Sequence, residues 1–198
     1  MDYSSFKTPY ISNQRIRELA EKARIEFWGK EAPVDIEKIL IKLKINIIPV
    51  NGLMTYIRFD SFISSDWKSV YVDNDAYFDD YKYRRVRFSM AHELGHSILH
   101  KEIYESLKIK SLEDYYSFYE NVSGDQYSFL EIQANNFASY FLVPRDILIE
   151  NREKLIKELK KKLEGSGHED ADLTDYIIEA LAEQFNVSPG PIRIALQS

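Results

Sequence analysis

The chain has no cysteine among its 198 residues, which excludes disulfide bonds and thiolate metal sites. Any metal ion would have to be held by imidazole and carboxylate groups. The sequence also lacks a run of about 18 apolar residues, so we expect no membrane-spanning helix. Its first five residues do not show the basic-then-apolar order of a secretory signal. Together these absences predict a cytoplasmic protein.

The chain has no excess of basic residues either. The 26 lysines and arginines are outnumbered by 32 aspartates and glutamates, which gives a net charge of -6. Such a chain has no general attraction for phosphate backbones or anionic lipid. We therefore expect neither direct nucleic-acid binding nor a membrane partner. Hydrophobic residues make up 44% of the chain, which is typical of a globular protein with a substantial core.

The spacing of apolar residues predicts a mainly helical chain with a small sheet. Two extended stretches at 54–63 and 69–72 are expected to form a hairpin, whose edge could pair with an extended peptide. Residues 101–127, rich in tyrosine and acidic residues, are expected to form a long, partly irregular connection. Helices are expected at 16–28, 35–43, 81–100, 129–142, 146–163 and 172–185, with a strand at 45–50 and a flexible break at 165–167.

Residues 92–96 read H-E-x-x-H and lie within the long helix expected around them. Residues four apart on a helix differ by about 40° of rotation and about 6 Å of rise, so His92 and His96 can face one metal ion. Glu93 lies about 100° from His92, where it can accept a proton from the attacking water. The pattern therefore predicts a metal site with two histidine ligands and a glutamate base. A chance match is the alternative, but three of the four histidines in the chain cluster here, with His100 as the third.

A catalytic zinc site usually has three protein ligands and one open position. His100 lies about 12 Å along the helix axis from His92, so one straight helix cannot direct all three histidines at one ion. We expect His100 to support a ligand from behind or to lie at the helix end. Glu131, at the start of the next long helix, is the better third ligand, although the helix dipole alone also favours an acid there. Asn135 follows one turn later, where it can hydrogen-bond a ligating histidine or orient Glu131.

These motifs resemble those of the ImmA/IrrE family of metallopeptidases. The resemblance rests on three blocks in order, at residues 87–100 (RFSMAHELGHSILH), 131–138 (EIQANNFA) and 141–144 (FLVP). It implies one Zn²⁺ per chain held by His92, His96 and Glu131, with Glu93 as general base. It also implies a protein substrate: a helix-turn-helix repressor of the phage-repressor type, cleaved by an antirepressor in a mobile-element or stress response. The long tyrosine-rich connection departs from the family pattern and leaves the identity of the substrate open.

We therefore expect an α+β, zincin-like metallopeptidase domain over residues 1–145, with a small β-sheet and the HExxH helix as its active-site helix. A helical C-terminal segment, residues 146–198, is expected to belong to the same globule. Within it, residues 181–193 resemble a helix-turn-helix core. This block is poor in basic residues and follows an acidic helix, which favours a packing role over DNA binding.

Two other functions remain open at this point. One is a DNA-binding regulator with a structural metal site, and the other is an adaptor that binds a repressor without cutting it. For catalysis, the group that stabilises the oxyanion is also open. Tyr56, Tyr127 and His100 are candidates on residue type alone.

Overall fold

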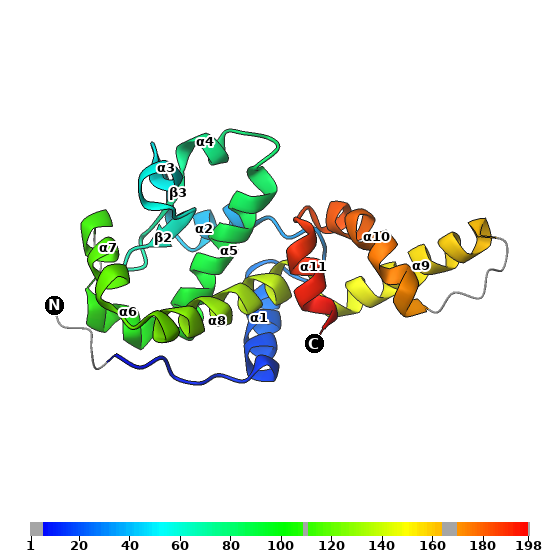
Figure 1. Ribbon diagram of the computed structural model, residues 1–198, viewed down its shortest axis with the longest axis horizontal. Coiled ribbons are helices and arrows are strands. Elements are labelled where there is room, and N and C mark those ends of the chain that lie inside the picture. The colour runs from blue at the N-terminus through cyan, green and yellow to red at the C-terminus, as the bar shows by residue number, and fades with distance from the viewer. Residues whose placement is uncertain (1–5, 109–110, 164–169, 198) are drawn as a thin grey trace.

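Two long helices lie side by side at the centre of the molecule (Figure 1). They are α5 (Tyr83–Leu99) and α8 (Gly124–Leu142) in a computed structural model that describes residues 6–108, 111–163 and 170–197. The expected break at 165–167 lies outside these residues. The helices approach closely because Gly95 has no side chain, and a Cβ there would lie 3.0 Å from Cδ1 of Phe137. The HExxH segment therefore lies in the core.

A three-stranded mixed sheet covers one side of α5 (Figure 1). Its strands are β1 (Asn46–Val50), β2 (Ser61–Ile63) and β3 (Ser69–Asp73), in the order β1-β3-β2. β3 pairs parallel to β1 and antiparallel to β2, so the expected hairpin is formed by β2 and β3. β3 is the central strand, which leaves β2 as the edge strand of the hairpin.

Short helices flank the sheet, and one of them corrects an expectation. α2 (Ile36–Lys42) begins at Asp35, whose carboxylate accepts a hydrogen bond from the Lys38 amide at 3.1 Å. α4 (Asn74–Tyr77) follows β3. Residues 54–57, expected to be extended, belong instead to α3 (Leu53–Ile57), which lies between Gly52 and Arg58, both with positive φ.

The tyrosine-rich connection is helical, contrary to the expectation of irregular structure. It forms α6 (Lys101–Leu107) and α7 (Leu112–Asn121), and α8 then begins at Gly124 rather than near residue 129. A capping box between Ser111 and Asp114 starts α7. Tyr104, Tyr115 and Phe118 are buried, so aromatic rings, two of which carry a hydroxyl group, contribute to the apolar face that the pattern did not reveal.

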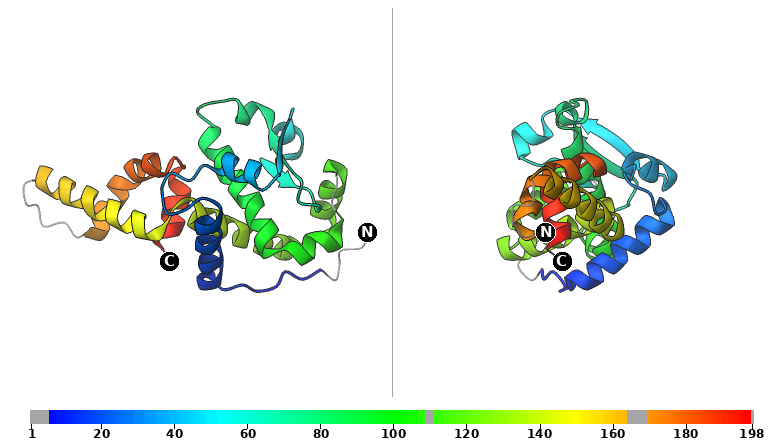
Figure 2. Two further views of the ribbon diagram at one scale, coloured as in Figure 1. Left: turned by 180° about the vertical axis from the view of Figure 1, so that it is seen from behind. Right: turned by 90° about the vertical axis from the view of Figure 1, so that its right-hand side faces the viewer.

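The remaining helices pack at the other end of α8 (Figures 1 and 2). α1 (Asn13–Phe27) crosses α8, and α9 (Arg145–Lys162), α10 (Asp170–Phe185) and α11 (Pro189–Leu196) form the C-terminal group. α11 contacts α8, and Arg87 of α5 donates hydrogen bonds to the carbonyl oxygens of Phe185, Asn186 and Val34. The whole is an α+β, zincin-like architecture. Among the described residues no helix has the length and apolarity needed to span a membrane.

Candidate metal centre

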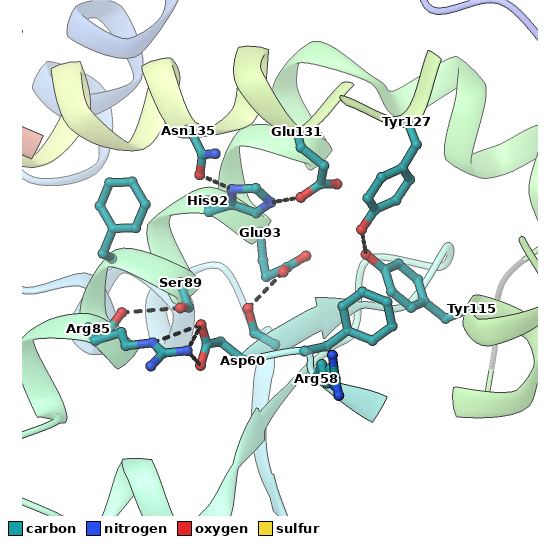
Figure 3. Close-up of a pocket in the computed structure, with 13 residues that line it drawn as sticks. Arg58, Asp60, Arg85, Ser89, His92, Glu93, Tyr115, Tyr127, Glu131 and Asn135 are labelled. Carbon is teal, nitrogen blue, oxygen red and sulfur yellow. Dashed lines mark hydrogen bonds and ion pairs between the residues drawn. The ribbon is translucent and has the colours of Figure 1, made fainter. Parts of the chain in front are cut away.

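Three side chains from the two central helices, His92, His96 and Glu131, converge on one point. Figure 3 shows two of them, His92 and Glu131, facing each other. Nε2 of His92 lies 2.9 Å from Nε2 of His96 and 3.2 Å from Oε2 of Glu131. Nε2 of His96 lies 3.5 Å from Oε1 of Glu131. Ligand atoms about 2.0–2.1 Å from a tetrahedral zinc ion are about 3.3 Å from one another, so these spacings fit a single ion. Oε1 of Glu131 is also buried with no hydrogen-bond partner among the described residues, as expected of an atom that a cation would satisfy.

The outer nitrogens of both histidines are engaged. Nδ1 of His92 lies 2.9 Å from Oδ1 of Asn135, one turn beyond Glu131 on α8. Nδ1 of His96 lies 3.0 Å from Nδ1 of His100, which is therefore behind His96 and not at the point of convergence. When Nδ1 donates to its partner, the lone pair of a neutral imidazole is on Nε2, which is the atom that faces the other ligands.

Glu93 lies beside this cluster but is not part of it. Its Oε1 accepts a hydrogen bond from Oγ of Ser61 on β2 at 2.7 Å. Its Oε2 is buried and has no partner among the described residues. Glu93 follows His92 directly on α5, so its side chain points in a different direction from the histidine ligands. Its carboxylate faces the cavity and forms part of the cavity wall.

The electrostatics follow from packing titratable groups of opposite charge together at a largely buried site. Burial raises the pKa of Glu93 above its usual value. Burial acts in the same direction on Glu131, but the adjacent histidines outweigh it and hold the pKa of that carboxyl well below its usual range. Burial opposes charge on His92, yet the Glu131 carboxylate raises the pKa of His92 to about 9. Burial lowers the pKa of His100 to about 3, so its ring is neutral.

A cavity of about 330 Å³ opens over the cluster (Figure 3). Its walls come from β2 and the segment before it, from α5, and from the aromatic residues of α7 and α8. Tyr115 and Tyr127 lie on one wall with their hydroxyl oxygens 3.1 Å apart. Of the three oxyanion candidates, Tyr127 lines the cavity, His100 lies behind His96, and Tyr56 is 84% exposed and does not line it.

Some residues of this site were not singled out by sequence reasoning. Ser61 contacts Glu93 across 32 positions of sequence, and no local pattern marks such a contact. Gln133 contacts His100 at 2.9 Å, and a glutamine among the buried residues of α8 was the available signal. Each depends on tertiary packing rather than on helical spacing.

The fold and the site together define an α+β domain of the HExxH class. Residues 82–197 match the model of peptidase family M78, described as the IrrE N-terminal-like domain. The match covers more than half of the chain, so the protein belongs to this family, as its three motif blocks predicted. A comparison with curated protein sequences gave no match.

One similar solved structure is a Mycobacterium tuberculosis transcriptional regulator, with a TM-score of 0.56 and 17% sequence identity. The alignment covers 96% of this chain and 48% of that protein, so the chain spans about half of its length. At this identity the likeness concerns the fold.

Proposed function

We propose that the protein is a zinc-dependent endopeptidase that holds one Zn²⁺ with His92, His96 and Glu131. The observation that carries the proposal is the convergence of these three donors beside Glu93, in a cavity with room for a substrate. Two imidazoles and one carboxylate, with no thiolate, form a donor set of the catalytic zinc type. When bound, the ion supplies Lewis acidity, which lowers the pKa of water and polarises a carbonyl group.

Glu93 is the general base in this proposal. Because Ser61 occupies Oε1, the unpartnered Oε2 is the atom that receives the proton from the attacking water. Burial raises the pKa of the carboxyl toward the working pH, which strengthens the base and later allows the proton to pass to the leaving amine.

The paired hydroxyls of Tyr115 and Tyr127 are the proposed donors to the oxyanion. Two hydroxyls carry two protons, and their mutual hydrogen bond uses one of them. The second proton is available to a group in the cavity. The pKa values of both tyrosines are raised by burial and by the nearby carboxylate of Glu131, so both hydroxyls stay protonated. An oxygen that gains negative charge during peptide hydrolysis would accept from this pair.

The end of β2 next to the cavity is the proposed contact for an extended peptide. Asp60 and Ser64 direct their backbone bonds toward β3, through Asp73 N to Asp60 O at 3.0 Å and Ser64 N to Ser69 O at 2.9 Å. By the alternation of an antiparallel ladder, the backbone groups of Ser61 and Ile63 point away from β3. Ile63 is completely buried and Ser61 is 7% exposed, so only the Ser61 end of this edge is within reach of a peptide in the cavity. A peptide paired at Ser61 would pass close to Glu93.

The proposed substrate is a helix-turn-helix repressor of the phage-repressor type, cut at one or very few bonds in the cytoplasm. Membership of the IrrE N-terminal-like family supports this substrate class and an antirepressor role in a mobile-element or stress response. The alternative is a regulator that binds DNA or a repressor without proteolysis. The similar Mycobacterium protein is a transcriptional regulator, which is consistent with that alternative. Against DNA binding, Arg193, a basic residue of α11, is held by Asp175 at 2.7 Å.

The test is co-incubation of purified repressors encoded near this gene with wild-type protein and with Glu93→Gln. We expect defined fragments of one repressor with wild type, no cleavage after treatment with EDTA, and an intact complex with Glu93→Gln. Unstructured casein serves as the control for general proteolysis. Intact repressors together with efficient casein cleavage would replace the narrow-substrate proposal with a general peptidase. Binding without cleavage by wild-type protein loaded with zinc would support the regulator.

A further inference from the structure

A chain of hydrogen bonds runs from the metal centre to the N-terminal segment. Nδ1 of His96 lies 3.0 Å from Nδ1 of His100, and Nε2 of His100 lies 2.9 Å from Oε1 of Gln133. Nε2 of Gln133 in turn donates to the carbonyl oxygen of Pro9 at 2.9 Å. The segment that carries Pro9 runs along α8 before it enters α1 (Figure 2). His96 and His100 are almost completely buried, at 0% and 1% exposure.

The carbonyl oxygen of Pro9, at the end of this series of hydrogen bonds, determines which groups are donors and which are acceptors. A carbonyl oxygen only accepts, so Gln133 must turn its NH₂ group toward Pro9 and its oxygen toward His100. That oxygen also only accepts, so Nε2 of His100 must carry a proton. The ring is buried, which favours a single ring proton. Nδ1 of His100 is then an acceptor, and Nδ1 of His96 must be the donor.

We infer that Gln133 and the Pro9 carbonyl fix the tautomer of His96 that leaves Nε2 open to a metal ion. This inference rests on the proposed function, because these hydrogen bonds affect metal binding only if His96 is a ligand. Gln133 is a positioning residue that acts through His100. In the opposite tautomer, Nε2 of His96 would carry the proton and could not bind the ion.

The first measurement is the zinc affinity of the full chain, determined by competition with a chromophoric chelator. Gln133→Leu removes both hydrogen bonds at nearly constant volume, and we expect it to weaken zinc binding about 10- to 100-fold. The matched control is Gln126→Leu. Gln126 is on the same helix and accepts a hydrogen bond from the Thr8 amide at 2.7 Å, but it is not part of the histidine chain. We expect the control to bind zinc as the wild type does.

The second measurement uses the ¹⁵N signals of the histidine rings in the wild-type protein, so it does not depend on a variant that folds. We expect His100 to carry its proton on Nε2 and His96 on Nδ1, with and without zinc. A proton on Nδ1 of His100, or equal losses of zinc affinity in Gln133→Leu and Gln126→Leu, would overturn the inference. If the wild type binds no zinc, the proposed function fails, and the ring signals still decide whether the tautomers are as stated.

Discussion

Among the described residues, the Glu93 carboxylate accepts one hydrogen bond, which comes from Ser61 on β2. A hydrogen bond donated to a carboxylate stabilises its charged form and lowers its pKa, against the effect of burial. Ser61 therefore adjusts the basicity of Glu93 as well as its orientation. At the scale of single residues, this contact links the pH dependence of the reaction to the sheet.

Replacing Ser61 by alanine is expected to raise the pKa of Glu93 further. The reaction needs the carboxylate form, so the acid limb of the pH profile of kcat/KM should move to higher pH. Ser89→Ala is the control, because Ser89 lines the same cavity but donates to the carbonyl oxygen of Arg85. An acid limb that is unchanged in Ser61→Ala, or that moves equally in both variants, would show that Ser61 does not influence the pKa of Glu93.

The tyrosine pair gives a second prediction at this scale. Replacing both Tyr115 and Tyr127 by phenylalanine removes both hydroxyls, and it should lower kcat about 100- to 1000-fold if the pair donates to the oxyanion. Zinc content and KM should stay near the wild-type values, because neither tyrosine is among the converging ligands. Tyr56→Phe, at an exposed position outside the cavity, should be neutral. Equal kcat values for the double variant and the wild type would exclude this role.

At the scale of elements, the site depends on how closely α5 and α8 pack. Gly95→Ala would place a Cβ 3.0 Å from Cδ1 and 3.2 Å from Cγ of Phe137, which is fully buried and stacked on Phe141. Overpacking of about 1–3 kcal/mol should exceed the gain of about 1 kcal/mol in helix propensity. We therefore expect denaturant unfolding to show a net loss of stability, on the order of 1 kcal/mol.

Gly190→Ala is the control for that measurement. Gly190 lies in α11, and nothing lies within 4 Å of the position of its Cβ. The substitution should therefore be neutral or stabilising. A Gly95→Ala variant that is as stable as Gly190→Ala would show that Phe137 can move. The size of residue 95 would then not determine how closely α5 and α8 pack.

The parts of the fold that were predictable are those with local signals. His92 and His96 lie on one helix, as their spacing predicted. Asp35 is the N-cap of α2, as expected for an aspartate before a helical pattern. The helices of the tyrosine-rich segment were missed because their buried faces include tyrosines, Tyr104 and Tyr115, whose hydroxyl groups weaken the apolar pattern. The contact of Gln133 with Pro9 spans 124 positions of sequence and depends on the complete fold.

At the scale of the whole molecule, Arg87 connects the HExxH helix to the C-terminal group. Its buried guanidinium donates to the carbonyl oxygens of Phe185 and Asn186, at the turn between α10 and α11, and of Val34 before α2. We propose that residues 146–198 form one folding unit with residues 1–145 through this contact and the packing of α11 on α8.

Arg87→Met tests that proposal. It leaves three carbonyl oxygens without their donor and should lower the free energy of unfolding by about 2–4 kcal/mol. The loss should appear in a single transition, with hydrogen exchange accelerated in α5, α10 and α11 alike. Arg84→Met, at the half-buried position three residues earlier in the sequence than Arg87, is the control and should change stability by less than about 1 kcal/mol. Early loss of protection in α10 and α11 alone would show that the C-terminal group unfolds independently.

The most direct test of the metal centre is the zinc content of purified protein, measured by elemental analysis of wild type, Glu131→Ala and Glu93→Gln side by side. Glu131 contributes an oxygen to the converging donors, whereas Glu93 lies beside them. We expect about one zinc ion per chain in the wild type and in Glu93→Gln, and a large loss in Glu131→Ala. A folded Glu131→Ala protein with the full zinc content of the wild type would contradict the ligand set on which the proposed function depends.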